Sequence, residues 1–481
     1  MSSRSGQDHS LHEGDITVVR AGHVLTMGPA GDISDGAVAF SAADGLIRAV
    51  GDYASVSAAF GETAVIGDGR DIVTPGFVNA HDHLSEGLIS GMGETMSLYE
   101  WADRLIRPVL QHLNMEMART GAMLKAAEMI RSGITTVNDM FVHFNPGSYA
   151  SLGVADGLDE VGLGGVICFG PEDMPDPLPT PTLLDEHEAL HDRIGRSSNL
   201  GFRLGIGTIH GQTDGLFRES IALAARHDWK VHTHLAEVRE EITEARLRYG
   251  TNTLGRGVRH GLLDLDVIFA HCIWVNEPDI EILKRRQASV AHNPVSNMIL
   301  ASGVCPVPRL RAAGIPVALG TDGAASNDSH DMLQVMKCAA LVQKLHHLDP
   351  LALSARDVLT MATIEGARAL RIDHRVGSLE IGKQADVVRF AGDGVRLAYV
   401  HDPYQQLVFC AGPDDAADVW VAGRQVLDTR RLTTADEVQI VSEARRLSAE
   451  LAARAGLEDL SAMAHQARQE NRTQGRARDA T

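Results

Sequence analysis

Short apolar runs, rich in β-branched residues, recur along the middle of the chain and predict buried parallel strands. Eight such runs lie between residues 74 and 322, and helical segments separate them. The runs cover residues 77–83, 134–140, 165–170, 202–210, 230–237, 267–272, 289–293 and 315–322. Eight βα units in succession predict an α/β fold, a closed (β/α)8 TIM barrel over residues 74–376.

Both ends of the chain carry a different pattern, in which short strand-like runs alternate with turns. In the N-terminal part these runs are residues 16–19, 23–27, 36–40, 46–50 and 63–66. In the C-terminal part they are residues 377–390, 407–411 and 418–421, followed by a turn at Gly423 and Arg424. Neither set alone has enough strands to bury a core, so we expect residues 1–73 and 377–433 to form one composite, smaller β-sandwich domain.

Two helices are expected after the eighth run. Residues 354–370 have apolar positions at helical spacing, with Ser354 as the expected N-cap. Thr434 and Glu437 have the spacing of a capping box that opens a helix to about Arg454. Residues 434–481 thus form a C-terminal helix and a polar tail, and we expect the last residues to be frayed.

The composition of the chain indicates which kinds of partner the protein can bind. A net charge of −19 disfavours binding to nucleic acid or to an anionic membrane, because both require a basic surface. The five cysteines are widely spaced and lack a C-x-x-C pair, so we interpret them as reduced thiols. The first residues lack the apolar core of a signal peptide, and no apolar run approaches about 18 residues, so a cytoplasmic enzyme with a small-molecule substrate is expected.

Polar residues concentrate at the carboxyl ends of the predicted strands, where barrel enzymes build their active sites. They are His81, His83, Asn138, Asp139, His210, His234, Glu237, His271, His292, Asn293 and Asp322. His81 and His83 are two residues apart on a strand, so their imidazoles point the same way. Histidine with carboxylate suits a divalent ion such as zinc, and His234 and Asp322 are the candidates to complete the site.

Each of these candidates has a plainer interpretation. A histidine pair on a strand is more often a surface or core feature than a ligand pair, and His232 fits a core histidine. Asp322 lies between Gly320 and Gly323 and suits a turn. His271 suits a buried histidine bonded to the backbone. The ligand interpretation is preferred because position and neighbouring residues agree.

Five ordered motifs, PGFVNAHDH, HTHLAE, AHC, VAHNPVSN and LGTDGAASND, resemble the amidohydrolase superfamily. The resemblance is closest to its branch of S-adenosylhomocysteine and methylthioadenosine deaminases, guanine deaminase-like enzymes and triazine hydrolases. MATIEGARAL and GSLEIGKQADVV extend the resemblance over nearly the whole chain. It implies that His81, His83, His234 and Asp322 bind one divalent metal ion, zinc before iron or manganese, and that the protein is a homodimer.

Two departures from the superfamily pattern matter. Asp82 stands where threonine is common, and its side chain should face away from the metal. Members with two metals bridge them through a lysine at the end of the third or fourth strand, but here the fourth run ends in Thr208, Ile209 and His210. One metal is therefore expected.

The predicted activity is hydrolysis of a carbon–nitrogen bond, most directly the deamination of an amino-substituted N-heterocycle by a metal-bound hydroxide. Asp322 would take the proton of the attacking water, His271 would hold and polarise the hydroxide, and Glu237 would protonate the ring nitrogen. One alternative is another leaving group, such as an alkylamine or halide on a triazine, or an amide, urea or carbamate. Another is an inactive homologue that serves as a scaffold, which the complete ligand set disfavours.

The substrate-binding residues are expected in the loops after the strands. In the nucleoside deaminases that the chain resembles, a glutamate in the loop after the first strand binds the ribose hydroxyls, and the corresponding place here is Leu110. No acid lies between residues 104 and 114, so a free heterocycle or a small amide or urea is predicted in preference to a nucleoside. The candidate substrate contacts are Met92, Trp101, Phe141, His210, His292 and Asn297. Helix packing is the alternative role for the apolar members, Trp101 above all.

Overall fold

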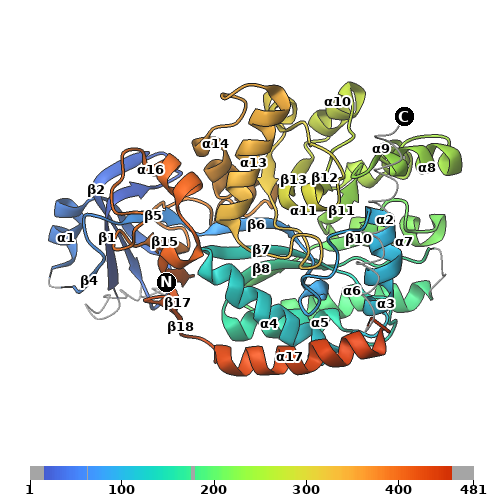
Figure 1. Ribbon diagram of the computed structural model, residues 1–481, viewed down its shortest axis with the longest axis horizontal. Coiled ribbons are helices and arrows are strands. Elements are labelled where there is room, and N and C mark those ends of the chain that lie inside the picture. Colours follow the sequence, from blue (N-terminus) through green and yellow to red (C-terminus); the bar gives the residue numbers. More distant parts are fainter. Residues whose placement is uncertain (1–15, 62, 175–178, 458–481) are drawn as a thin grey trace, which may run out of the picture.

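Parallel strands surrounded by helices form the middle of the chain (Figure 1). The computed structural model describes residues 16–61, 63–174 and 179–457. The parallel strands are β6 (Phe77–Asp82), β7 (Ile134–Phe141), β8 (Gly164–Phe169), β9 (Leu200–Phe202), β10 (Leu204–Thr208), β11 (Val231–Leu235), β12 (Val267–His271), β13 (Ser289–His292) and β14 (Val317–Leu319). Each predicted run contains a strand, and the fourth is divided into β9 and β10 at Arg203.

These strands pair in two parallel sheets, in the orders β6-β7-β8-β9 and β10-β11-β12-β13-β14. Further backbone hydrogen bonds join the sheets. The Arg203 amide donates to the Ile167 carbonyl at 3.2 Å, and the Asp322 amide donates to the His81 carbonyl at 3.0 Å. All residues of β6, β7 and β8 are buried, as expected for parallel strands covered on both faces, and the polar side chains of β6 and β7 are buried with the apolar ones.

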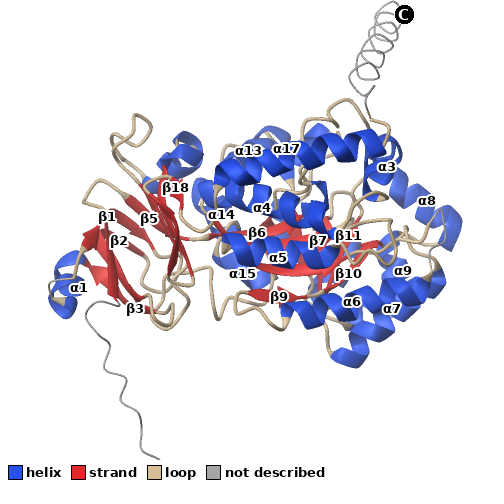
Figure 2. Cartoon of the chain, turned by 90° about the horizontal axis from the view of Figure 1, so that it is seen from below, coloured by secondary structure: helices blue, strands red, loops and turns tan. Residues whose placement is uncertain are grey.

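Helices cover the outer faces of the parallel strands (Figure 2). The longer ones are α4 (Met115–Arg131), α5 (Ser151–Val161), α6 (Thr180–Ile194), α7 (Asp214–His227), α8 (Arg239–Tyr249), α9 (Thr253–Arg259), α10 (Glu277–Arg285), α13 (Met332–His347) and α14 (Ala355–Met361). Shorter segments are η2 (Leu84–Glu86), α2 (Leu98–Trp101), η3 (Ala102–Ile106), α3 (Arg107–Leu110), η4 (Leu262–Asp264), α11 (Pro294–Ile299), α12 (Val307–Ala312) and α15 (Ile364–Ala369). Segments η2 to α3 form the long connection after β6, which reaches the carboxyl ends of the strands.

A third sheet is built from both ends of the chain. Its strands are β1 (Ile16–Leu25), β2 (Asp32–Ser41), β3 (Ile47–Asp52), β4 (Val65–Ile66), β5 (Ile72–Pro75), β15 (Val387–Phe390), β16 (Ala416–Val421), β17 (Arg424–Asp428) and β18 (Arg431–Leu432). They pair in the order β18-β17-β16-β15-β5-β1-β2-β3, with β4 beside β1. The antiparallel pair β5–β15 joins the N-terminal strands to the C-terminal strands. Helix α1 (Tyr53–Phe60) follows β3.

This third sheet curls on itself and encloses its own core. Phe40 of β2 and Trp420 of β16 are separated by three strands in the sheet order, yet their ring centroids lie 5.6 Å apart. One continuous sheet therefore supplies the two-layered core that the sequence suggested as a sandwich. Phe390 of β15 stacks on Phe77 of β6 with centroids 5.9 Å apart, which packs this sheet against the first parallel strand.

Two predicted strands are one strand in the structure, and a third predicted strand is helical. The runs at residues 16–19 and 23–27 are one continuous strand, β1, because it pairs with β2 along its whole length. Residues 407–411, predicted as a strand, lie largely in the helical segment α16 (Pro403–Gln405) and η5 (Gln406–Cys410). Asp402 caps this helical segment by accepting a hydrogen bond from the Gln405 amide at 3.0 Å.

The helix predicted at residues 354–370 is divided into α14 and α15. Ser354 is its N-cap, as predicted, with Asp357 completing the capping box. The division occurs because the Ala362 carbonyl accepts a hydrogen bond from the Val78 amide of β6 at 2.8 Å, which removes it from the helical pattern.

The C-terminal helix α17 (Glu437–Arg454) lies along the outside of α4 (Figure 1). Its N-cap is Asp436 and not the predicted Thr434, whose hydroxyl donates to the Val161 carbonyl. Arg446 contacts Glu116 of α4 at 2.6 Å. The predicted polar tail lies outside the described residues. Within the described part of the chain, no helix has the length and apolar character needed to span a membrane.

Candidate functional site

Histidine and aspartate side chains from three strand ends converge on one point. His81 ends β6, His83 follows it, His234 lies on β11 and Asp322 follows β14. The His83 and His234 Nε2 atoms are 3.1 Å apart. Asp322 Oδ1 lies 3.4 Å from His81 Nε2 and 3.6 Å from His83 Nε2. The structure thus brings together all four residues for which metal binding was predicted.

The donor atoms of this cluster fit a divalent cation. His83 Nδ1 donates to the Met140 carbonyl at 2.7 Å and His234 Nδ1 donates to the Gly207 carbonyl, so each imidazole turns the lone pair of its Nε2 inward. Burial, followed by the nearby His81, lowers the pKa of both side chains, which keeps them in the neutral form that binds metals. His81 Nε2 is buried and has no hydrogen-bond partner among the described residues. Three nitrogen atoms and a carboxylate form a donor set suited to zinc.

His81 is held from behind by a second buried histidine. His232 Nε2 lies 2.9 Å from His81 Nδ1, and the Asn138 amide nitrogen lies 3.1 Å from His232 Nδ1. His232 was predicted to be a core histidine, and its side chain is fully buried in the structure. Its contact with a candidate ligand fixes the orientation of the His81 ring.

Glu237 and His271 lie beside the metal cluster. His271 Nε2 is 3.3 Å from Glu237 Oε2 and 3.8 Å from Asp322 Oδ2. Burial, followed by the charges of Asp322 and Glu241, raises the pKa of Glu237 well above its ordinary value. Burial lowers the pKa of His271 to about 3. In this arrangement a carboxyl group with a raised pKa and an imidazole with a lowered pKa face the same space.

The backbone is strained at three of these strand ends. Ala236, His271 and Asp322 have φ values of 51°, 71° and 65°, in the left-handed region that residues with a side chain rarely adopt. Such conformations cost on the order of 1–3 kcal/mol each and cluster at functional sites. Here they are held by hydrogen bonds, such as the one from the Ala236 amide to the Glu241 carboxylate at 2.9 Å.

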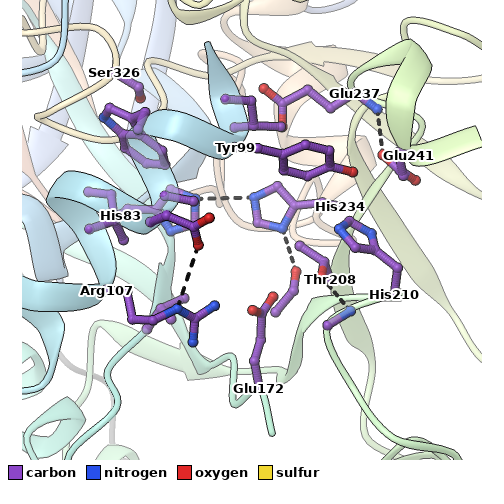
Figure 3. Close-up of a pocket in the computed structure, with 18 of the residues that line it drawn as sticks. His83, Tyr99, Arg107, Glu172, Thr208, His210, His234, Glu237, Glu241 and Ser326 are labelled. Carbon is purple, nitrogen blue, oxygen red and sulfur yellow. Dashed lines mark hydrogen bonds and ion pairs between the residues drawn. The ribbon is translucent and has the colours of Figure 1, made fainter. Parts of the chain in front are cut away.

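A cavity of about 460 Å³ opens over this cluster (Figure 3). Its walls come from the connection between β6 and α4 and from the loops after β7, β8, β10 and β11. The polar lining residues include His83, Glu86, Tyr99, Asp103, Arg107, Glu172, Thr208, His210, His234, Glu237, Glu241, Glu244, Arg248, His271, Asp322 and Ser326. The volume is within the range of pockets that hold small molecules.

Comparisons with known proteins agree with this geometry. Residues 72–426 match the model of the amidohydrolase family. The chain belongs to that family. It is 38% identical over 365 residues to a 5-methylthioadenosine/S-adenosylhomocysteine deaminase of Thermococcus kodakarensis, covering 76% of this chain and 84% of that protein. It is 34% identical over 383 residues to a 5'-deoxyadenosine deaminase of Methanopyrus kandleri, and this match covers 79% of this chain and 87% of that protein.

A solved structure of an adenosine deaminase from Xanthomonas campestris with bound zinc has a TM-score of 0.84 and 31% identity to this chain. The structural match covers 90% of this chain and 98% of the adenosine deaminase chain. This amidohydrolase is therefore a hydrolase that acts on carbon–nitrogen bonds. The prediction of metal-dependent hydrolytic deamination of an N-heterocycle is confirmed.

The predicted substrate contacts of this amidohydrolase divide into two groups. Trp101 and His210 line the cavity, whereas Met92, Phe141, His292 and Asn297 do not. Trp101 is also anchored, since its indole nitrogen donates to the Ala325 carbonyl at 2.9 Å. His210 lies across from Tyr99, with ring centroids 6.3 Å apart.

The four residues outside the lining have other surroundings. Phe141 is fully buried in the main hydrophobic core, and Met92 packs against the same core. His292 is buried, with neither ring nitrogen bonded to a described residue. Asn297 contacts the site indirectly, because its amide nitrogen lies 2.8 Å from His271 Nδ1. We therefore treat Asn297 as a positioning residue for His271.

Sequence reasoning missed Glu172, which lines the cavity from the loop after β8. Leu110 lines the cavity at the place where a ribose-binding glutamate was sought. That expectation concerned the loop after β6 alone, and Glu172 brings a carboxylate to the cavity from the loop after β8. The sequence did offer a signal for Glu172, because this residue comes just after the third predicted strand, where active-site residues of a barrel lie.

Proposed function

We propose that this amidohydrolase binds one zinc ion through His81, His83, His234 and Asp322. The inward-facing lone pairs of the histidines and the nearby carboxylate support this assignment. The ion, when bound, supplies a Lewis acid that makes water nucleophilic near neutral pH. Zinc is favoured because the similar adenosine deaminase structure holds zinc.

The chain's own residues supply the proton transfers. The reaction adds water to the carbon that bears the amino group and releases ammonia, leaving a carbonyl on the ring. Asp322 accepts a proton from the attacking water and passes it to the amino group, which leaves as ammonia, while the remaining hydroxyl proton of the adduct returns to Glu237 as the carbonyl forms. Glu237, whose pKa is raised, gives its proton to the ring nitrogen. His271, whose Nε2 lies between the two carboxylates, donates a hydrogen bond to the oxygen as it adds to the ring.

The proposed substrate is an adenine ring that carries a sugar-like substituent. The relatives named 5'-deoxyadenosine deaminase and methylthioadenosine/S-adenosylhomocysteine deaminase support adenine compounds. The single observation that carries the proposal is the convergence of Glu237, His271 and Asp322 on the floor of a cavity large enough for a base and its substituent. The cavity continues past His234 toward Glu172 and His210 (Figure 3), which leaves space beyond the ring.

We also propose that the two parallel sheets close into a (β/α)8 barrel over residues 74–376. The adjacency of β9 and β10 in the chain supports this, as does the bond between the Asp322 amide and the His81 carbonyl. The curled sheet of residues 16–73 and 377–433 is proposed as a separate domain. Trp420 and Phe40 support it, because they form a core of their own.

Ammonia release by the purified, zinc-loaded protein tests the activity. The substrates compared are 5'-deoxyadenosine, methylthioadenosine, S-adenosylhomocysteine, adenine, guanine and a triazine. We expect the highest kcat/KM on an adenine nucleoside. A clear preference for guanine or the triazine would overturn the substrate, and no ammonia from any compound would overturn the reaction.

A further inference from the structure

We infer that Glu172 is the specificity-determining acceptor of this pocket. It selects adenine compounds whose substituent carries hydrogen-bond donors, such as the hydroxyl pair of a ribose or an ammonium group. The inference rests on the proposed deamination of an adenine nucleoside. It assigns a role to a residue on the loop after β8, away from the connection after β6 where such an acceptor was first sought.

Glu172 is distinguished by its lack of partners. Seven carboxylates line the cavity: Glu86, Asp103, Glu172, Glu237, Glu241, Glu244 and Asp322. Six of them contact a donor or a cation within the described part of the chain. Glu172 has neither a hydrogen bond nor an ion pair with any described residue.

The two arginine side chains that line the cavity contact residues other than Glu172. Arg107 Nε lies 3.9 Å from Asp103, and its guanidinium lies 4.7 Å from the centre of the Phe144 ring. Arg248 contacts Glu244 at 2.6 Å. The sequence from residue 171 to 192 contains no lysine or arginine that could neutralise Glu172 locally. A carboxylate without a partner in a pocket gains most from a ligand that donates hydrogen bonds.

The backbone around Glu172 is nevertheless fixed. The Gln212 amide nitrogen donates to the Pro171 carbonyl at 2.7 Å, and the Thr213 hydroxyl donates to the Asp173 carboxylate at 2.7 Å. Both neighbours of Glu172 are thus tied to the loop after β10. A side chain that is held at its base and unbonded at its tip is preorganised for a ligand.

Two glycines provide the space in which the Glu172 side chain lies. A Cβ atom at Gly207 would be 2.7 Å from Glu172 Cγ, and one at Gly211 would be 2.5 Å from Glu172 Cδ. Neither glycine has a positive φ, so close approach explains them: Glu172 lies against both, together with the Gly170 carbonyl at Gly207 and the Thr208 hydroxyl at Gly211. Gly207 also accepts the hydrogen bond of His234, which puts Glu172 next to the metal cluster.

The charge of the pocket sets the chemistry of the selected substituent. Seven acidic side chains and two arginines line the cavity, and both arginines already have acidic partners. An anionic substituent would meet repulsion at Glu172, whereas a hydroxyl pair or an ammonium group would complete its hydrogen bonds. Figure 3 shows the Glu172 carboxylate directed into the cavity between Arg107 and His210.

The test compares Glu172→Gln with the parent and with Glu219→Gln, which makes the same change at an exposed position of α7. Four substrates are used with the zinc-loaded proteins: 5'-deoxyadenosine, 2',3'-dideoxyadenosine, 5'-amino-5'-deoxyadenosine and adenine. We expect Glu172→Gln to raise KM for 5'-deoxyadenosine roughly 10- to 100-fold, with kcat changed less than about threefold. The kcat/KM of Glu172→Gln for adenine and for 2',3'-dideoxyadenosine should differ less than about threefold from that of the parent. Glu219→Gln should match the parent on all four substrates.

A binding measurement accompanies the kinetics. Calorimetric titration with 5'-deoxyinosine, the deaminated product, should show the same loss of affinity in Glu172→Gln. Glu172→Asp, which keeps the charge but shortens the reach, serves as the second variant and should show a partial loss. A loss confined to the amino compound would support the inference with ammonium as the recognised group.

Two results would count against the inference and distinguish its failure from that of the proposed function. Equal losses on all four compounds, or no loss on any, would mean that Glu172 has a structural role or none. If the parent releases no ammonia from any adenine compound, the proposed function fails and this inference fails with it.

Discussion

The buried pair of Asp82 and His330 allows a stability effect to be worked out from the structure. Asp82 occupies the position where the resembling enzymes commonly have threonine, and its side chain faces away from the metal cluster. His330 Nε2 lies 3.1 Å from Asp82 Oδ2, and both side chains are fully buried. Asn79 and Thr321 donate to the same carboxylate oxygen at 2.8 and 2.7 Å. The pair thereby ties β6 to the segment after β14.

The size and sign of the effect follow from the pKa of His330. Burial lowers this pKa, but Asp82 and then Glu128 outweigh burial and raise it from 6.5 to about 9. A pKa raised in the folded state contributes stability that is complete below the unfolded value of 6.5 and is lost as pH rises through 9. The difference corresponds to about 3 kcal/mol, since each pKa unit is worth about 1.4 kcal/mol.

Asp82→Asn should therefore lower the free energy of unfolding by about 3 kcal/mol at pH 6, and the difference from the parent should shrink as pH rises from 6.5 to about 9. Urea unfolding followed by circular dichroism, at constant zinc and with Glu219→Gln as the control, measures it. The asparagine side chain is close in shape to aspartate, so packing is retained. If the difference in free energy of unfolding between Asp82→Asn and the parent does not depend on pH, or is below about 1 kcal/mol at pH 6, Asp82 and His330 do not form a stabilising ion pair.

Three further predictions concern the site. Glu237→Gln should keep its zinc and fold but lose about 10² or more in kcat, because a proton donor is removed; turnover at the parental rate would contradict this role. His234→Ala should lose zinc by elemental analysis while its circular dichroism is retained, and full retention of the metal would rule out the ligand assignment. Asn297→Ala should lower kcat roughly tenfold with little change in KM, because His271 loses the bond at 2.8 Å that orients its ring. A change in KM alone would instead indicate substrate contact by Asn297.

The sequence by itself determined the strands of the middle region and the chemistry at their ends. Apolar runs long enough for one strand each, separated by helical segments, admit few arrangements other than parallel βα units. Parallel strands place their carboxyl ends together, so His81, His83, His234 and Asp322 had to lie on one side of the sheet. The ordered motifs then led to the amidohydrolase family, which the comparisons confirm.

The sequence was less decisive where tertiary contacts override local pattern. Residues 407–411 are apolar enough for a strand, yet they continue a capped helical segment whose Leu407 and Val408 are buried. The helix at residues 354–370 divides because a strand amide takes one of its carbonyls. Local propensity is a weak guide when the partner comes from a distant part of the chain.

Only the tertiary structure decided which polar residues contact one another. Asn297 and His292 share a motif, but the path of the chain places Asn297 against His271 and leaves His292 in the interior. The absence of partners around Glu172 depends on loops from three different strands and on the space left by Gly207 and Gly211. Such contacts are set by the packing of whole elements, and no spacing along the chain encodes them.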